Sequence, residues 1–147
     1  HETLNTEMAL HVGFCADFGI SKEELAATKP SPTTVGYTNH MIQTGFSGSA
    51  GEIATVILPC AWGYCEIGQM LADRGAPESQ PLYARWIEMY NSPEFEELAA
   101  WLRSFVDRIA NDAGEEELAR MKRAFMISSQ YEYMFWDAAY RLEAWPV

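Results

Sequence analysis

Apolar residues recur along this chain with the three-to-four-residue spacing of amphipathic helices. One stripe near the N-terminus ends at Gly19, and it consists of Leu4, Met8, His11, Cys15 and Phe18. A longer stripe follows Ser49 and consists of Ile53, Ile57, Cys60, Tyr64, Ile67 and Leu71. No segment shows the strict alternation of a convincing strand. The pattern therefore predicts an all-α protein.

Helix start signals place the boundaries of the predicted elements. Ser21-x-x-Glu24 and Ser49-x-x-Glu52 have the spacing of capping boxes, and Ser92-Pro93 places an N-cap before a first-turn proline. We expect helices at about 4–18, from 21 onward, at 33–46, 49–74, 83–91, from 93 onward and at 115–143. Residues 29–32 are expected to be non-helical, because each proline pushes its predecessor toward extended geometry. Pro59 should bend the helix that contains it.

The last predicted helix carries two polar residues on an otherwise apolar stripe. The stripe is Leu118, Met121, Phe125, Ser128, Glu132, Phe135, Ala139 and Leu142. A carboxylate in an apolar seam costs several kcal/mol if it stays charged and unpaired, so Glu132 needs a partner, a proton or a ligand. A tyrosine or arginine of another helix could satisfy it structurally. A role in proton transfer is the alternative.

The three cysteines differ in their surroundings. Their odd number and the absence of a C-x-x-C pair argue against a disulfide scaffold or a zinc knuckle. Cys60 directly follows Pro59 and lies one helical turn before Tyr64, so it is a candidate nucleophile. We interpret Cys15 and Cys65 as structural.

Composition and charge exclude several classes of function. The 147 residues suit one domain, and 10 Lys+Arg against 21 Asp+Glu give a net charge of −11, which disfavours nucleic acid and anionic membrane surfaces. No apolar run reaches the ~18–20 residues of a membrane span, so we expect a cytoplasmic protein. Glu7 and His11 form an i, i+4 pair, but no Glu-x-x-His repeat supports a metal site. The aromatic residues (13 %) are either core or the lining of a slot for a flat heteroaromatic ring.

Several segments together resemble the TenA/thiaminase II family. They include Leu58-Pro-Cys-Ala-Trp-Gly-Tyr-Cys-Glu-Ile-Gly68, Ser128-Ser-Gln-Tyr-Glu-Tyr-Met-Phe-Trp136 and Tyr37-Thr-Asn-His-Met41. The resemblance implies a haem-oxygenase-like helical bundle that forms a homotetramer and uses no metal or cofactor. It implies hydrolysis of 4-amino-5-aminomethyl-2-methylpyrimidine to the 5-hydroxymethyl compound in thiamin salvage. Many such proteins also cleave thiamin, more slowly.

The resemblance also assigns roles to residues. Cys60 matches the nucleophile and Glu132 the acid/base of the cysteine-using members. Tyr37 and Tyr90 match tyrosines of the pyrimidine pocket, and Tyr64 matches an aromatic position beside the cysteine. A non-catalytic pyrimidine- or thiamin-binding protein of the same fold, acting in regulation, is the alternative. A haem or di-metal oxidase on the same bundle is a further alternative.

Family members carry a further helical portion before the part that this chain matches. That portion has a Gln-Asp-x-x-Tyr-type motif whose aspartate holds the pyrimidine, and no aspartate here stands in that context. We therefore expect residues 1–147 to form a single helical domain that corresponds to the C-terminal two-thirds of a TenA-like domain.

Overall fold

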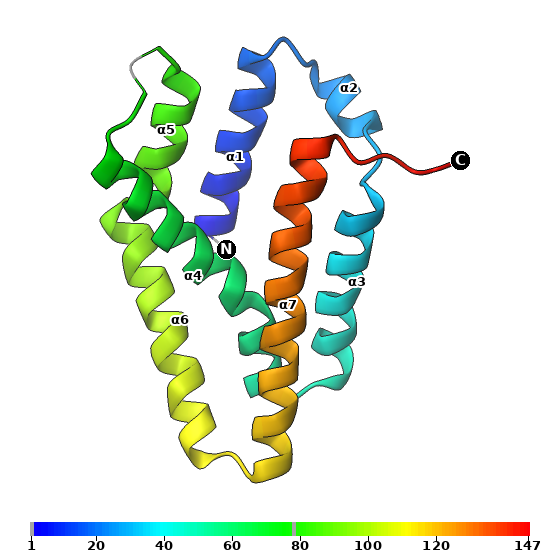
Figure 1. The fold of residues 1–147 in the computed structure, drawn as a ribbon, viewed down its shortest axis with the longest axis vertical. Helices are drawn as coiled ribbons and strands as arrows, with labels where there is room; N and C mark the ends of the chain where they lie inside the picture. The colour runs from blue at the N-terminus through cyan, green and yellow to red at the C-terminus, as the bar shows by residue number, and fades with distance from the viewer. Residues whose placement is uncertain (1, 78) are drawn as a thin grey trace. The chain divides into compact units, whose positions relative to one another are not determined.

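The computed structural model describes residues 2–77 and 79–147, and these form helices joined by loops, with no strand among them (Figure 1). The helices are α1 (Glu2–Asp17), α2 (Lys22–Ala27), α3 (Pro32–Ser47), α4 (Ala50–Arg74), α5 (Pro81–Tyr90), α6 (Pro93–Asp112) and α7 (Glu115–Arg141). The all-α prediction is confirmed. The chain divides into two compact units, one up to Pro30 and one from Ser31 to Val147. Within the described ranges, no helix has both the length and the apolar character needed to cross a membrane.

The first unit contains α1 and α2. Gly19 follows α1 with φ at +78°, a conformation that favours glycine. The predicted capping box begins α2, because the Ser21 side chain accepts from the Glu24 amide and the Glu24 carboxylate accepts from the Ser21 amide. The predicted stripe on α1 is wrong in part, since Met8 and Phe18 are exposed. Leu4 lies among the residues whose side chains are outside the described part.

The second unit is organised around α4, which packs against α7, α6 and α5, while α3 packs against α7 and α4. Its main apolar cluster joins α4, α6 and α7, and consists of Ala54, Leu58, Leu102, Val106 and Met121. A second buried cluster joins α4, α5 and α6 through Cys65, Tyr90, Phe95 and Ala99. The burial of Cys65 agrees with its structural interpretation.

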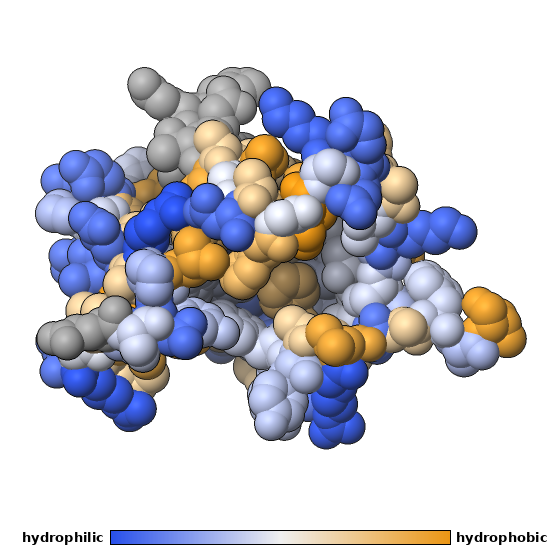
Figure 2. All heavy atoms as spheres, turned by 90° about the horizontal axis from the view of Figure 1, so that it is seen from above, coloured by the Kyte–Doolittle hydropathy of each residue, from blue (hydrophilic) through white to orange (hydrophobic). Residues whose placement is uncertain are grey.

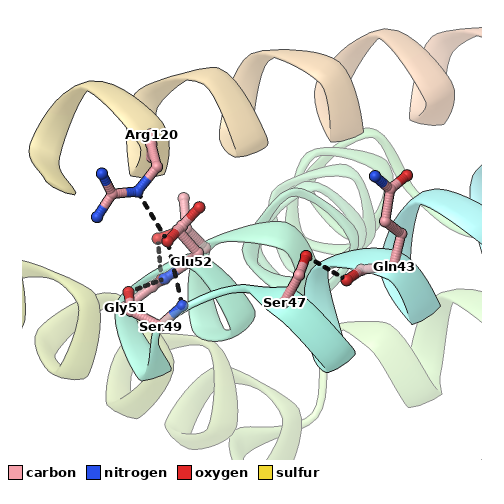
Figure 3. A network of polar contacts seen from close by, with 7 residues as sticks. Gln43, Ser47, Ser49, Gly51, Glu52 and Arg120 are labelled. Carbon is pink, nitrogen blue, oxygen red and sulfur yellow. Dashed lines mark hydrogen bonds and ion pairs between the residues drawn. The ribbon is translucent and has the colours of Figure 1, made fainter. Parts of the chain in front are cut away.

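The start of α4 is fixed by a network of polar contacts (Figure 3). Ser49 and Glu52 form the predicted capping box, in which the Ser49 amide donates to Glu52 Oε2 at 3.1 Å. Arg120 of α7 donates from Nε to the same oxygen at 3.2 Å. Gly75 follows α4 with φ at +89° and ends it as predicted. Pro59 lies inside α4, and the bend that we expect there stays a prediction.

The first turn of α3 is hydrogen-bonded to Glu143, near the C-terminal end of the unit. Pro32 is the first residue of α3, so the prediction that it lies outside a helix is wrong, because a first-turn proline needs no amide donor. The Glu143 carboxylate accepts from the Thr33 amide at 2.9 Å and from its hydroxyl at 3.0 Å. Residue 143 was expected in the last helix, but α7 ends at Arg141, and Leu142 is left-handed with φ at 53°.

Two of the predicted apolar stripes are displaced from the faces that are buried. On α7 the buried residues are Met121, Ala124, Ser128 and Ala138, whereas Phe135 and Leu142 are exposed. On α4 the buried face includes Gly51, Ala54 and Gly68, whereas Ile57 is 45 % exposed. The spacing of hydrophobic residues does not reveal these faces, because small residues are also buried where helices pack closely. Figure 2 shows hydrophobic residues at the surface beside hydrophilic ones.

Candidate functional site

Glu132 is held by a tyrosine from another helix. The Tyr37 hydroxyl, on α3, donates to Glu132 Oε1, on α7, at 2.7 Å. Tyr37 is only 7 % exposed, and its ring stacks on Tyr131 with 5.3 Å between centroids and 9° between planes. Gly36 allows this approach, since a Cβ there would lie 3.2 Å from the Tyr131 hydroxyl. The carboxylate of the apolar stripe therefore has a neutral donor as its partner.

The surroundings of Tyr37 keep its proton in place. Burial raises the pKa of Tyr37 far above its ordinary value, and the hydrogen bond to Glu132 raises it further. The negative charges of Glu132 and of a Cys60 thiolate act in the same direction. Tyr37 is therefore a permanent hydrogen-bond donor near neutral pH, and it can stabilise a carboxylate without protonating it.

Cys60 approaches the same pair from α4. It is partly buried and is not in a disulfide. Its charge acts on Tyr37, so the thiol lies within electrostatic reach of the Tyr37 hydroxyl. A hydrogen bond thus joins Tyr37 of α3 to Glu132 of α7, and a negative charge at Cys60 of α4 would raise the pKa of Tyr37.

Tyr64 and Tyr90 belong to a second group, built of aromatic rings. Tyr64 lies 4.9 Å from Tyr90 and 5.4 Å from Trp136 between ring centroids, and Tyr90 lies 4.5 Å from Trp86. Gly68 lets α5 approach α4, because a Cβ there would lie 2.6 Å from the backbone carbonyl carbon of Tyr90. Tyr64 follows Cys60 by one helical turn, so α4 carries both groups along one face.

A cavity of about 360 Å³ lies between α4 and α7. Its wall includes Glu132 together with Pro59, Trp62, Gly63, Glu66, Ile67, Phe125 and Ser129. Trp62 and Glu66 were not among the predicted site residues, and a hydrogen bond of 2.6 Å from the Trp62 indole to the Glu66 carboxylate joins their side chains. Their i, i+4 spacing places them on one side of the helix of Cys60, but it does not show that this side lines a cavity. Glu132 therefore faces an apolar space large enough for a small heteroaromatic ring.

The described side chains offer no group of three or more His, Cys, Asp or Glu placed to hold a metal ion. Glu7 and His11 do lie together, with 3.8 Å between His11 Nε2 and Glu7 Oε1. What the second unit assembles instead is a thiol, a carboxyl group and a buried phenol. That set can perform nucleophilic addition with proton transfer.

Comparison with known proteins gives a consistent result. The model of the TENA/THI-4/PQQC family matches residues 1–142. The chain is 40 % identical over 145 residues to the aminopyrimidine aminohydrolase of Halalkalibacterium halodurans, covering 99 % of this chain and 65 % of the relative. It is 42 % identical over 143 residues to that of Bacillus subtilis, covering 97 % and 60 %. The chain therefore spans slightly less than two-thirds of the length of these relatives.

The fold agrees with a solved structure. The TenA homologue from P. horikoshii superposes with a TM-score of 0.81 at 28 % identity, covering 94 % of this chain and 63 % of the other. The expected family resemblance and helical fold are confirmed by these matches.

Proposed function

This chain belongs to the TENA/THI-4/PQQC family, and from that premise we propose that the protein is an aminopyrimidine aminohydrolase of thiamin salvage. Its substrate is 4-amino-5-aminomethyl-2-methylpyrimidine, and its products are the 5-hydroxymethylpyrimidine and ammonia. The observation that carries the proposal is the hydrogen bond of 2.7 Å from Tyr37 to Glu132, whose side chain lines an apolar cavity. Relatives of this chain that bear the same enzyme name support it.

The proposed chemistry uses Cys60 as nucleophile and Glu132 as acid/base. The thiolate adds to C6 of the pyrimidine while the Glu132 carboxylic acid gives its proton to the neighbouring ring nitrogen. The dearomatised ring expels ammonia from the 5-methylene, and water adds at that carbon. Loss of the thiolate from C6, with return of the ring-nitrogen proton to the Glu132 carboxylate, then restores the aromatic ring. Tyr37 stabilises the Glu132 carboxylate that forms when the proton leaves.

The aromatic group supplies the proposed binding surface. Tyr64, Trp86 and Trp136 present rings at tilted and edge-to-face angles beside the helix face that carries Cys60, and Tyr90, which is 1 % exposed, packs against Tyr64 and Trp86. Such rings hold a flat heteroaromatic substrate by stacking and by phenol hydrogen bonds. Thiamin, which carries the same pyrimidine, is proposed as a second and slower substrate. Assembly as a homotetramer and a place in the cytoplasm stay predictions.

The test is detection of hydroxymethylpyrimidine by mass spectrometry after the protein is incubated with the aminomethylpyrimidine. Cys60→Ser is measured alongside, with Cys15→Ser as the matched cysteine control. We expect product from the wild type and from Cys15→Ser, and none above background from Cys60→Ser. Product from all three would remove Cys60 from the mechanism. Absence of product from the wild type, with the pyrimidine still bound, would favour the non-catalytic binding protein.

A further inference from the structure

Ser128 is the most completely buried polar side chain of the second unit. It is 0 % exposed, and its hydroxyl makes no hydrogen bond of good geometry within the described part of the chain. A buried hydroxyl without a partner destabilises a fold, whereas alanine at such a position is close to neutral. The fold therefore gives no reason for a serine here, and an unsatisfied group of this kind calls for an explanation in function.

The position of Ser128 points to Tyr37. Ser128 precedes Glu132 by one turn of α7, and α3, which carries Tyr37, packs along this helix. The Ser128 hydroxyl acts on the Tyr37 hydroxyl and lowers the pKa of Tyr37, against the larger effect of burial. That direction is the one expected when Ser128 donates toward the phenol oxygen. Ser128 and Glu132 are four residues apart and so lie on the same face of α7, and Glu132 on that face accepts from the Tyr37 hydroxyl.

We propose that Ser128 is a positioning residue whose hydroxyl donates to Tyr37 and completes a chain from Ser128 through Tyr37 to Glu132. The assignment rests on the proposed function, because this hydrogen-bond chain acts on Glu132, the acid/base of that reaction. Hydrogen bonds of an active site are often long or poorly aligned in the free protein and tighten when substrate binds. The Ser128 hydroxyl, which has no hydrogen-bond partner among the described residues of the free protein, agrees with this behaviour.

The hydrogen-bond chain from Ser128 through Tyr37 acts when Glu132 loses its proton to the ring nitrogen. The carboxylate then carries a full negative charge, and Tyr37 donates to it more strongly when its own oxygen accepts from Ser128. No atom is gained or lost at Ser128, and no proton leaves it. Because the effect grows as charge develops on Glu132, it lowers the barrier and leaves substrate binding nearly unchanged.

The first measurement is the turnover of Ser128→Ala. We expect kcat to fall about ten-fold, the value of roughly one buried hydrogen bond, with KM within about two-fold of wild type and no loss of thermal stability. Ser128→Thr, which keeps the hydroxyl, should retain more turnover than alanine. Thr55→Val is the matched control, because Thr55 is also buried but donates to the Gly51 carbonyl at 2.6 Å. Its kcat should equal that of wild type.

A second measurement needs no turnover. The ¹³Cζ chemical shift of Tyr37, assigned with Tyr37→Phe, reports hydrogen bonds to the phenol oxygen in the free protein. It should move in Ser128→Ala and stay unchanged in Thr55→Val. An unchanged shift, or an unchanged kcat in Ser128→Ala, overturns the proposal. If the wild type has no hydrolase activity, the proposed function fails and the shift alone decides whether the Ser128–Tyr37 contact exists. Should the alanine variant not fold, Ser128→Cys replaces it in both measurements.

Discussion

Glu52 and Glu132 are two glutamates of the same helical unit with opposite surroundings. Glu52 accepts from the Ser49 amide and from the Arg120 guanidinium, so its charge is matched by fixed donors and a cation (Figure 3). Glu132 accepts from the neutral hydroxyl of Tyr37 and faces an apolar cavity. The first arrangement favours the charged form of Glu52 and lowers its pKa, whereas the second gives Glu132 a single neutral partner. The two glutamates therefore differ in the charge of their partners and in the cavity beside Glu132, and mutation of each can test whether that difference separates a structural from a catalytic role.

Among the variants that distinguish Glu132 from Glu52, Glu132→Gln should have the largest effect on turnover. We expect turnover of the aminopyrimidine to fall about 10²- to 10⁴-fold, because the amide cannot supply the proton. The amide oxygen still accepts from Tyr37, so the free energy of unfolding should change by less than about 1 kcal/mol. Steady-state kinetics and urea unfolding of the same preparation check both values. Marked unfolding with intact specific activity in the folded fraction would make Glu132 a structural residue.

Glu52→Ala should lower stability and leave turnover unchanged, the opposite of what we expect for Glu132→Gln. Loss of the capping box and of the contact with Arg120 should lower the free energy of unfolding by about 1–2 kcal/mol while kcat stays at the wild-type value. Urea unfolding measures the first and the product assay the second. The matched control is Glu97→Ala, on the exposed face of α6, which should stay within about 0.5 kcal/mol of wild type. A fall in kcat for Glu52→Ala would mean that the two regions are coupled.

The helix cap that contains Glu52 and the need of Glu132 for a partner could both be predicted from the sequence, because each depends on residues close by in the same helix. Ser49-x-x-Glu52, Ser21-x-x-Glu24 and Ser92-Pro93 start helices as expected, because caps depend on neighbouring residues alone. Glu132 was singled out as a carboxylate that required a partner, and a tyrosine on another helix satisfies it. The roles of Cys60 and Glu132 in catalysis stay predictions that the experiments above address.

The contacts between helices could not be predicted in the same way. Which side of α4 is buried depends on four neighbouring helices, and small residues such as Gly68 mark it better than Ile57 does. The pairing of Glu143 with the start of α3 spans 110 residues and leaves no local pattern. Trp62 and Glu66 were missed because helical spacing does not reveal which face lines a cavity.

The pH dependence of stability sharpens the comparison further. The Ser49 amide, with help from Arg120, lowers the pKa of Glu52 from its ordinary value of 4.5. A lowered folded-state pKa contributes stability that is fully present above the unfolded value and disappears as the pH falls through the folded value. The difference in unfolding free energy between wild type and Glu52→Gln should therefore be constant from neutral pH to about 5 and shrink below 4.5. Urea unfolding from pH 7 to 3 measures it, and a difference that grew on acidification would contradict the assignment.

The smallest expected effect is the contribution of the Glu52–Arg120 ion pair to stability, considered apart from the contribution of the Ser49–Glu52 cap. The Arg120 side chain is 50 % exposed, so its ion pair with Glu52 should contribute only about 0.5 kcal/mol, and less in high salt. A double-mutant cycle of Glu52→Ala and Arg120→Ala, followed by urea unfolding at low and high salt, isolates this coupling energy. We expect it to be the smaller part of the Glu52 effect, with the remainder due to the cap. A coupling energy equal to the whole effect would mean that the cation alone fixes Glu52. The contrast with Glu132 would then reduce to one charged partner against one neutral partner.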